Sequence, residues 1–151
     1  MSDILIVTFE AGGNVPPALG TGRELHRRGH RVRVLGHAMQ KSVIESAGLE
    51  FRAYRSSPRW TPHARLSTWT VLTMGGLAMV TDPGGIGRDL RDEVRADPAD
   101  LVVVDCMLFN ALDAAAREDL RHVALFHTFY AAFDGSFRRG PFGVVARSKG
   151  L

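Results

Sequence analysis

Short apolar runs alternate with helix-like segments along this chain, and this alternation restricts the possible folds more than any other feature of the sequence. Residues 3–9, with the sequence DILIVTF, form a β-branched and aromatic run typical of a strand that is buried on both faces. Residues 15–28 carry small and apolar side chains at helical spacing, and Gly29 is suited to end that helix. Strands and helices that alternate in this way build a parallel sheet with right-handed crossovers. We therefore predict an α/β fold with a Rossmann-like, doubly wound parallel sheet.

The same pattern continues through the chain, with one long interruption. The stretch from Arg55 to Gly85 separates two halves and, at 31 residues, is too long for a simple connection. Its tryptophans, Trp60 and Trp69, could pack over a cleft or cap the core. We treat residues 1–151 as one domain because the chain has room for a single core. Further strands are predicted at residues 31–35, 49–54, 101–105 and 122–126, and further helices at residues 41–47, 86–95 and 107–118.

Composition excludes several classes of protein. With 45% hydrophobic and 23% charged residues, the chain has the balance of a globular protein and not that of a disordered polymer. Cys106 is the only cysteine, so we expect neither an intrachain disulfide nor a cysteine-based zinc site. No apolar stretch reaches the ~20 residues that span a bilayer, and no signal peptide is visible. We expect a soluble, cytoplasmic protein without stable membrane insertion.

Two charged segments are predicted to be solvated surfaces. The basic cluster within residues 23–33 could attract nucleic acid, but Glu24 dilutes it and the net charge of +3 is mild, so we predict no nucleic-acid partner. Within residues 88–95 acidic and basic side chains alternate, which predicts a helix surface crossed by its own salt bridges and no metal site. The basic cluster comprises Arg23, His26, Arg27, Arg28, His30, Arg31 and Arg33, and the acidic residues of the second segment are Asp89, Asp92 and Glu93.

The turn after the first strand does not have the features of a dinucleotide site. Gly12 and Gly13 follow the strand, but prolines at positions 16 and 17 stand where the G-x-G-x-x-G fingerprint needs glycine. The acidic residue expected after the second strand is replaced by Gly36 and His37. A nucleotide-binding oxidoreductase is therefore disfavoured.

Polar residues follow the strands that we expect at the centre of the sheet. In the strand order 3-2-1-4-5, ligands bind beyond the carboxyl ends of the first and fourth strands. The first strand is followed by Glu10 and Asn14, the fourth ends at Asp105, and His127 follows the fifth. We expect these four side chains to meet at one edge of the sheet.

Three segments resemble a known family. They are GGNVPPAL at residues 12–19, RELHRRGHRV at residues 23–32 and LVVVD at residues 101–105, the last followed by an alanine-rich helix. Together with the opening strand, they look like the N-terminal half of GT-B glycosyltransferases of family one. That family includes bacterial antibiotic and macrolide glycosyltransferases and UDP-glucuronosyltransferase relatives. The resemblance covers nearly all of residues 1–127.

The resemblance implies an inverting transfer of a sugar from a nucleotide donor to a small lipophilic acceptor, such as an aromatic or polyketide-like aglycone. In such enzymes the N-terminal domain holds the acceptor, and a separate C-terminal domain holds the UDP- or TDP-sugar. We therefore expect this chain to bind no cofactor or metal and to have little activity alone. Residues 55–85 would be the acceptor-facing insertion. The acceptor would then contact Glu10, Gly12, Gly13, Trp60, Trp69, Met74 and Met79.

The family places a histidine or aspartate after the first strand as general base, and an aspartate after the fourth strand to orient it. Asp105 matches the second position, but Asn14 occupies the first, and a carboxamide cannot usefully accept a proton. Asp105 or His127 could act as base, Glu10 could do so, or an acidic acceptor could need only orientation by Asn14. We favour Asp105 as base, with Asn14 hydrogen-bonding the acceptor and His127 nearby.

Two further expectations concern function and assembly. A non-catalytic small-molecule-binding or auxiliary protein that retains the acceptor pocket is the alternative to an enzyme, because Asn14 replaces the base. An incomplete sheet also leaves an edge to cover, which predicts a homodimer or pairing with the rest of the chain.

Overall fold

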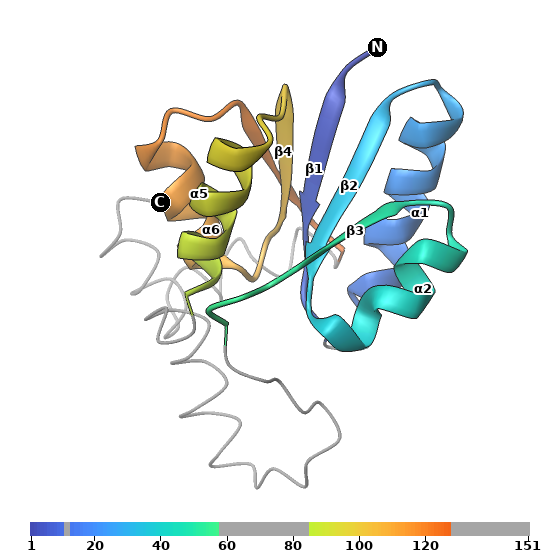
Figure 1. Cartoon of the computed structure of the whole chain (residues 1–151), viewed down its shortest axis with the longest axis horizontal. Coiled ribbons are helices and arrows are strands. Elements are labelled where there is room, and N and C mark those ends of the chain that lie inside the picture. The colour runs from blue at the N-terminus through green and yellow to red at the C-terminus, as the bar shows by residue number, and fades with distance from the viewer. Residues whose placement is uncertain (11–12, 58–84, 128–151) are drawn as a thin grey trace, which may run out of the picture.

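The computed structural model describes residues 1–10, 13–57 and 85–127. In these ranges five parallel strands form one sheet in the order β3-β2-β1-β4-β5, which confirms the predicted class and strand order (Figure 1). Every strand lies within two residues of its predicted bounds. The strands are β1 (Asp3–Val7), β2 (Arg31–Gly36), β3 (Glu50–Ala53), β4 (Leu101–Asp105) and β5 (His122–Leu125).

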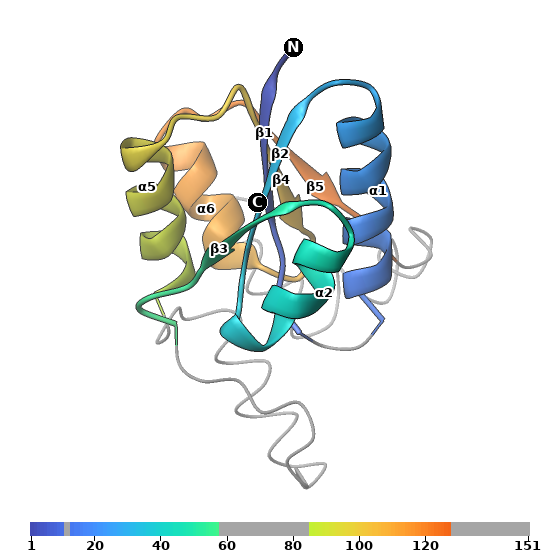
Figure 2. The same ribbon diagram turned by 45° about the vertical axis from the view of Figure 1, so that its right-hand side comes forward.

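Helices cover both faces of the sheet. α1 and α2 lie on one face, and α5 and α6 lie on the other (Figures 1 and 2). No helix in the described part of the chain is both long and apolar enough to cross a bilayer. The helical segments are α1 (Val15–Arg27), the 3₁₀ turn η1 (Ala38–Gln40), α2 (Lys41–Ser46), α5 (Ile86–Ala96) and α6 (Phe109–Arg117).

Each face of the sheet has its own apolar core. Successive side chains of a strand point to opposite faces, so one continuous apolar run supplies both cores. The core beneath α5 and α6 contains Leu5, Val7, Leu35, Val102, Val104, Leu90 and Ala111. The core beneath α1 and α2 contains Ile4, Ile6, Val32, Val34, Ala18, Leu19 and Ile44.

Gly22 lets α1 lie close to the sheet. A methyl group at this position would stand 2.8 Å from Leu49 Cδ1 and 3.1 Å from Ile6 Cδ1, closer than carbon atoms normally approach. Gly20, two residues earlier on the same helix, is exposed, and a methyl group there would meet nothing within 4 Å. The sequence prediction that the small-residue face of this helix packs on the sheet is confirmed.

This pair of glycines provides a matched test of packing. Gly20→Ala should stabilise the protein by about 0.5–1 kcal/mol, because alanine loses less backbone entropy than glycine in a helix. Gly22→Ala gains the same helix propensity but must displace Leu49 and Ile6, and overpacking of this kind costs about 1–3 kcal/mol. Urea unfolding of both variants measures the difference. Equal stabilisation by the two substitutions would show that α1 does not pack closely at Gly22.

Arg33 departs from the prediction of a solvated basic face. Its side chain is 0% exposed and points from β2 toward α5, on the same face as Leu35. Its guanidinium donates to Asp3 Oδ1 at 2.7 and 3.0 Å, to Glu93 Oε1 at 3.0 Å and to the Asp97 carbonyl at 2.9 Å. The sequence alternation placed Arg33 on the surface, but α5 covers that face, and Glu93 of α5 together with Asp3 of β1 supplies the carboxylates that a buried charge needs.

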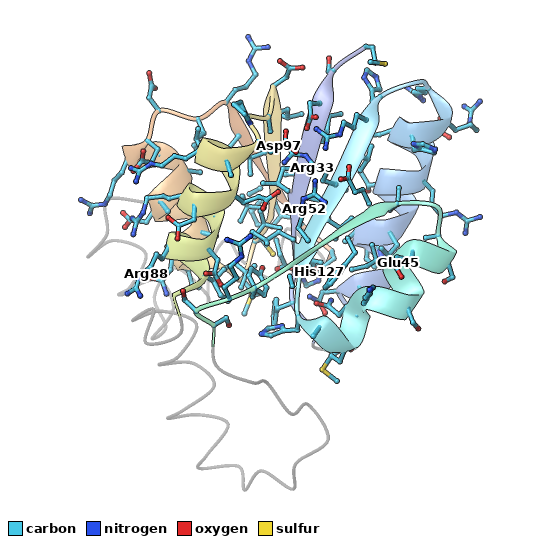
Figure 3. The ribbon with its side chains drawn as sticks, in the orientation of Figure 1. Arg33, Glu45, Arg52, Arg88, Asp97 and His127 are labelled. Carbon is cyan, nitrogen blue, oxygen red and sulfur yellow. The ribbon has the colours of Figure 1, made fainter. Side chains whose placement is uncertain are left out.

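Flanking charges extend this network. Arg31 bonds to Asp3 and Asp97, and Arg52 of β3 bonds to Glu93. The hydrogen bond from Arg31 is the main reason that the pKa of Asp97 falls to about 2. Figure 3 shows Arg33, Arg52 and Asp97 gathered between the strands and α5.

The prediction that α5 is crossed by its own salt bridges is wrong for its two most buried acidic residues. Glu93 pairs with arginines of β2 and β3 instead. Asp89 is buried, and its carboxylate accepts hydrogen bonds from the backbone N–H groups of Arg55, Ser56 and Ser57. The helix therefore uses its acidic side chains to hold the sheet and the backbone that leaves β3.

Removing the buried guanidinium tests this network. Arg33→Met should lower the free energy of unfolding by about 1.5–3 kcal/mol, because the buried charge-assisted hydrogen bonds to Asp3 and Glu93 are lost while these carboxylates keep only the more exposed Arg31 and Arg52. Arg28→Met is the control, since the exposed Arg28 pairs only on the surface with Glu24 and its loss should cost less than about 0.5 kcal/mol. Urea denaturation of the two variants gives the comparison. A small effect of Arg33→Met would mean that apolar packing, and not the ion pairs, positions α5.

Candidate functional site

The site lies at the carboxyl edge of the sheet, where β1 and β4 are neighbours and the strand order reverses. Asp105 is the last residue of β4, Asn14 directly precedes α1, and His127 follows β5. Asp105 is paired in register with Leu125, which brings the end of β5 beside it. Figure 3 shows His127 at this edge, at the opposite end of the sheet from Asp97. Of the four predicted polar groups, the structure brings these three together.

Asp105 is the centre of the arrangement. It is 1% exposed, and hydrogen-bond donors reach both of its carboxylate oxygens. Oδ2 accepts from Asn14 Nδ2 at 2.9 Å, and Oδ1 accepts from the Met107 backbone N–H at 2.9 Å. His127 Nε2 lies 3.1 Å from the same Oδ1. α6 begins at Phe109, two residues after the predicted start at residue 107.

Asn14 acts as a donor to two close acceptors, with the Thr8 hydroxyl farther away at 3.5 Å. Its side-chain nitrogen donates to the Phe9 carbonyl at 2.7 Å as well as to Asp105, and the residue is 2% exposed. A carboxylate at this place would face a carbonyl oxygen and another carboxylate, whereas the carboxamide donates a hydrogen bond to both. The structure thus gives Asn14 the role of a hydrogen-bond donor to Asp105.

His127 lies between the buried Asp105 carboxylate and the protein surface. The side chain is 10% exposed, and because a carboxylate only accepts hydrogen bonds, Nε2 carries the proton that faces Asp105. In the neutral ring Nδ1 is then the nitrogen with a free lone pair. The Cys106 sulfur lies 4.0 Å from Nε2, and burial raises the pKa of the Cys106 thiol above its usual range.

Tyr54 and His37 extend the polar edge toward β3. The Tyr54 hydroxyl donates to the Thr8 carbonyl at 2.8 Å, and burial, followed by the charge of Asp105, raises its pKa well above the usual range. The His37 ring packs edge-on against Tyr54, its Nε2 lies 3.3 Å from Ser57 Oγ, and burial lowers its pKa. The sequence analysis missed Tyr54 as a site residue, although its place directly after β3 at the ligand edge was the available signal.

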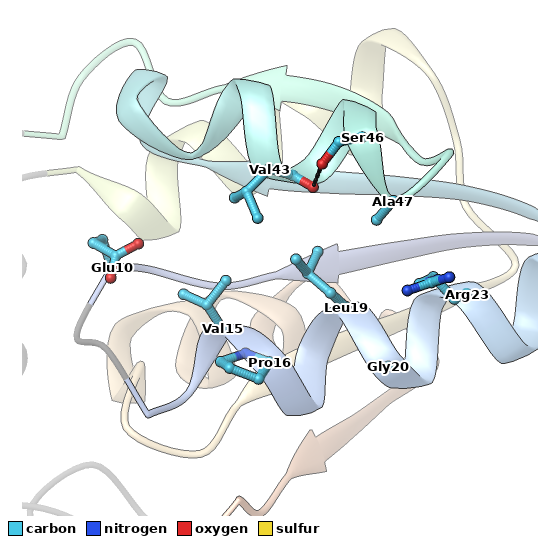
Figure 4. Close-up of a pocket in the computed structure, with 9 residues that line it drawn as sticks. All are labelled: Glu10, Val15, Pro16, Leu19, Gly20, Arg23, Val43, Ser46 and Ala47. Carbon is cyan, nitrogen blue, oxygen red and sulfur yellow. Dashed lines mark hydrogen bonds between the residues drawn. The ribbon is translucent and has the colours of Figure 1, made fainter.

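Glu10 lies close enough to His37 for its charge to oppose the effect of burial on the His37 pKa. It lies at one end of an open groove between α1 and α2 (Figure 4). Gly13 is exposed beside Asn14. The other predicted acceptor contacts, Gly12, Trp60, Trp69, Met74 and Met79, lie outside the described residues. The groove is also lined by Val15, Pro16, Leu19, Gly20, Arg23, Val43, Ser46 and Ala47.

Comparison with solved structures identifies proteins of the same fold. The glycotransferase of kitacinnamycin matches with a TM-score of 0.68 and 20% identity, over 98% of this chain and 38% of its own. The calicheamicin glycosyltransferase CalG4 matches with a TM-score of 0.66 and 24% identity, over 99% of this chain and 43% of its own. The glycosyltransferase SnogD from Streptomyces nogalater matches with a TM-score of 0.61 and 22% identity, over 100% of this chain and 40% of its own.

These structural neighbours are GT-B glycosyltransferases, as the sequence resemblance predicted. The chain spans about two fifths of the length of the proteins that it matches. Neither a protein-family model nor a curated protein matches the chain. At these identities the comparison establishes the fold, and the chemistry has to be argued from the site.

The donor role of Asn14 can be tested by changing its charge. Asn14→Asp places a new carboxyl group beside Asp105, so its pKa in the folded state should rise above the unfolded value of about 3.9. A group with a raised folded pKa loses stability as the pH rises. Near pH 4 the new carboxyl should be protonated and able to donate a hydrogen bond to Asp105. Between pH 4 and pH 7, as it ionises, the free energy of unfolding of the variant should fall by about 2 kcal/mol or more.

The thermal unfolding midpoint from pH 4 to pH 8 measures this loss. Asn14→Ala serves as the control, because it removes the donor without adding a charge and should lack the additional loss that appears only as the new carboxyl ionises. The same pH profile in the two variants would contradict the donor assignment.

Proposed function

We propose that this chain is the acceptor-binding part of an inverting glycosyltransferase that acts in secondary metabolism. The donor would be a UDP- or TDP-sugar bound by a separate domain, and the acceptor would be a small lipophilic aglycone, aromatic or polyketide-like. The observation that carries the proposal is the Asn14–Asp105–His127 cluster at the ligand edge of a GT-B-like sheet. The proposed chemistry needs no metal in the transfer step.

The neighbours support the choice of donor and acceptor. Their names include glycosyltransferases of kitacinnamycin and calicheamicin and a forosaminyltransferase of spinosyn. Two of the matched structures were solved with thymidine diphosphate, and a plant neighbour was solved with UDP. A transferase for a natural-product aglycone with a nucleoside diphosphate sugar is the function most consistent with these proteins.

The environment of Asp105 supports a division of roles within the cluster. Asp105 is 1% exposed and both of its oxygens accept hydrogen bonds inside the protein, so burial leaves an acceptor hydroxyl little access to the carboxylate. His127 has Nε2–H on Asp105 and a lone pair on Nδ1, the arrangement of a base oriented by a carboxylate. We assign proton abstraction to His127 Nδ1 and orientation of the ring to Asp105, in place of the sequence-based preference for Asp105 as base.

The transfer step then follows from these positions. The acceptor hydroxyl gives its proton to His127 Nδ1 while its oxygen forms a bond to the anomeric carbon of the sugar. The bond from that carbon to the nucleoside diphosphate breaks on the opposite side, which inverts the configuration. Asp105 stabilises the imidazolium that forms. Both hydrogens of Asn14 Nδ2 point to Phe9 and Asp105, which supports a positioning role for Asn14.

Substitutions of the two central residues test these roles in the active transferase, which joins this chain to a donor-binding domain. Asp105→Asn and His127→Ala should each lower turnover by roughly 10²-fold or more. Added imidazole should restore part of the turnover of His127→Ala but not of Asp105→Asn. His122→Ala is the control, because His122 begins β5 at the end remote from Asp105 and should leave turnover within about twofold.

The outcomes separate the alternatives. Near-normal turnover of Asp105→Asn would remove Asp105 from the mechanism, and near-normal turnover of His127→Ala would remove His127. Calorimetric binding of aromatic aglycones without any transfer in the joined protein would favour a non-catalytic binding protein. The isolated chain should transfer little or no sugar. A cytoplasmic location and a homodimer through an edge strand stay predictions from the sequence.

A further inference from the structure

Three metal-ligating side chains converge at the carboxyl ends of β4 and β5. A carboxylate oxygen of Asp105, the sulfur of Cys106 and a ring nitrogen of His127 all lie within 4.8 Å of one another. Asp105 and Cys106 are 1% and 5% exposed, and the His127 side chain borders the surface at 10%. Buried oxygen, sulfur and nitrogen ligands in one place are the ligand types of a transition-metal site, unlike the exposed acidic clusters common on protein surfaces.

We infer that Asp105, Cys106 and His127 form a site for a thiophilic divalent cation such as Zn²⁺ or Cd²⁺, with a fourth position open to water. Tetrahedral zinc has bonds of about 2.3 Å to sulfur and about 2.0 Å to nitrogen and oxygen, which separates its ligand atoms by roughly 3.3–3.6 Å. Here His127 Nε2 lies 3.1 Å from Asp105 Oδ1 and 4.0 Å from Cys106 Sγ. All three ligand atoms lie within 4.8 Å of one another, so side-chain shifts of up to about an ångström would bring them to zinc distances.

The ligand set also determines which cations fit. A thiolate and an imidazole select Zn²⁺ and Cd²⁺ over Mg²⁺ and Ca²⁺, which prefer oxygen ligands. Binding releases the Cys106 thiol proton to solvent, and the His127 proton moves from Nε2 to Nδ1. Asp105 keeps its donors from Asn14 and Met107, which would orient the carboxylate as outer partners of the metal. The sequence excluded a site built on several cysteines, but this mixed set needs only one.

Metal binding and proton abstraction use the same atoms. The cation would occupy the space between Asp105 Oδ1 and His127 Nε2, where the hydrogen bond that orients His127 now lies. It would also place the ring proton on Nδ1, the nitrogen to which the proposed function assigns the acceptor proton. In a transferase of the proposed kind, an occupied site would therefore block transfer. This consequence rests on the proposed function, whereas the metal site itself does not.

Cadmium titration of the purified chain, freed of metal by a chelator, tests the site without any sugar donor. We expect one Cd²⁺ per chain by calorimetry, together with a thiolate-to-cadmium charge-transfer band in the near ultraviolet. Cys106→Ser should abolish the band and weaken binding at least 10-fold, and His127→Ala should weaken binding to a similar degree. His26→Ala, which removes an exposed histidine of α1, should bind like the parent, and Mg²⁺ should not compete.

Urea unfolding of each variant, without metal, checks that weaker binding does not reflect loss of the fold. The inference is overturned if the parent shows no band at millimolar Cd²⁺, or if Cys106→Ser and His127→Ala bind as tightly as the parent. Inhibition of transfer by Cd²⁺, normalised to the metal-free rate of each variant, is a separate measurement. Failure of transfer would leave the metal result standing, and absence of metal binding would leave the transferase proposal standing.

Discussion

The buried guanidinium of Arg33 is the interaction on which the arrangement of one half of the molecule depends. It connects β2 to Asp3 at the start of β1 and to Glu93 and Asp97 at the end of α5. A buried charge is tolerated only with such partners, so the network leaves α5 little freedom on the sheet. Asp89, one helical turn before Glu93, then holds the backbone after β3 at the opposite edge. The same helix therefore carries acidic partners for both edges of the sheet.

At the ligand edge, Asp105 likewise joins several elements through hydrogen bonds. Its donors come from three places, Asn14 before α1, Met107 after β4 and His127 after β5, and the first of these is 91 residues away in sequence. Enclosure of the carboxylate by N–H groups makes it suited to holding a neighbouring ring and unsuited to meeting a substrate directly. The cluster resembles an oriented histidine base, and the same atoms form the ligand set of a soft cation.

Much of the fold could be predicted from the chain alone. Continuous apolar runs such as residues 101–105 specify buried parallel strands, and glycines at positions 29 and 48 adopt positive φ at the ends of helices. The site was predicted in part: Asn14, Asp105 and His127 meet as expected, because the carboxyl ends of neighbouring parallel strands share one edge. Glu10 lies in the groove between α1 and α2, and Tyr54 was not anticipated.

The differences between the contacts expected from the sequence and those in the structure have one physical origin. The periodicity of apolar residues depends on local backbone geometry, so it indicates which side chains face the core. It therefore predicts the strands, the helices and the edge of the sheet where ligands bind. It does not state which polar groups become partners, because Arg33, Asp89 and Asn14 find theirs on segments between 5 and 91 residues away. The exclusion of water between packed elements makes those pairings obligatory. The local sequence pattern thus determined the architecture. Packing between distant segments decided the partners of the charged residues, the donor role of Asn14 and the proximity of Asp105, Cys106 and His127.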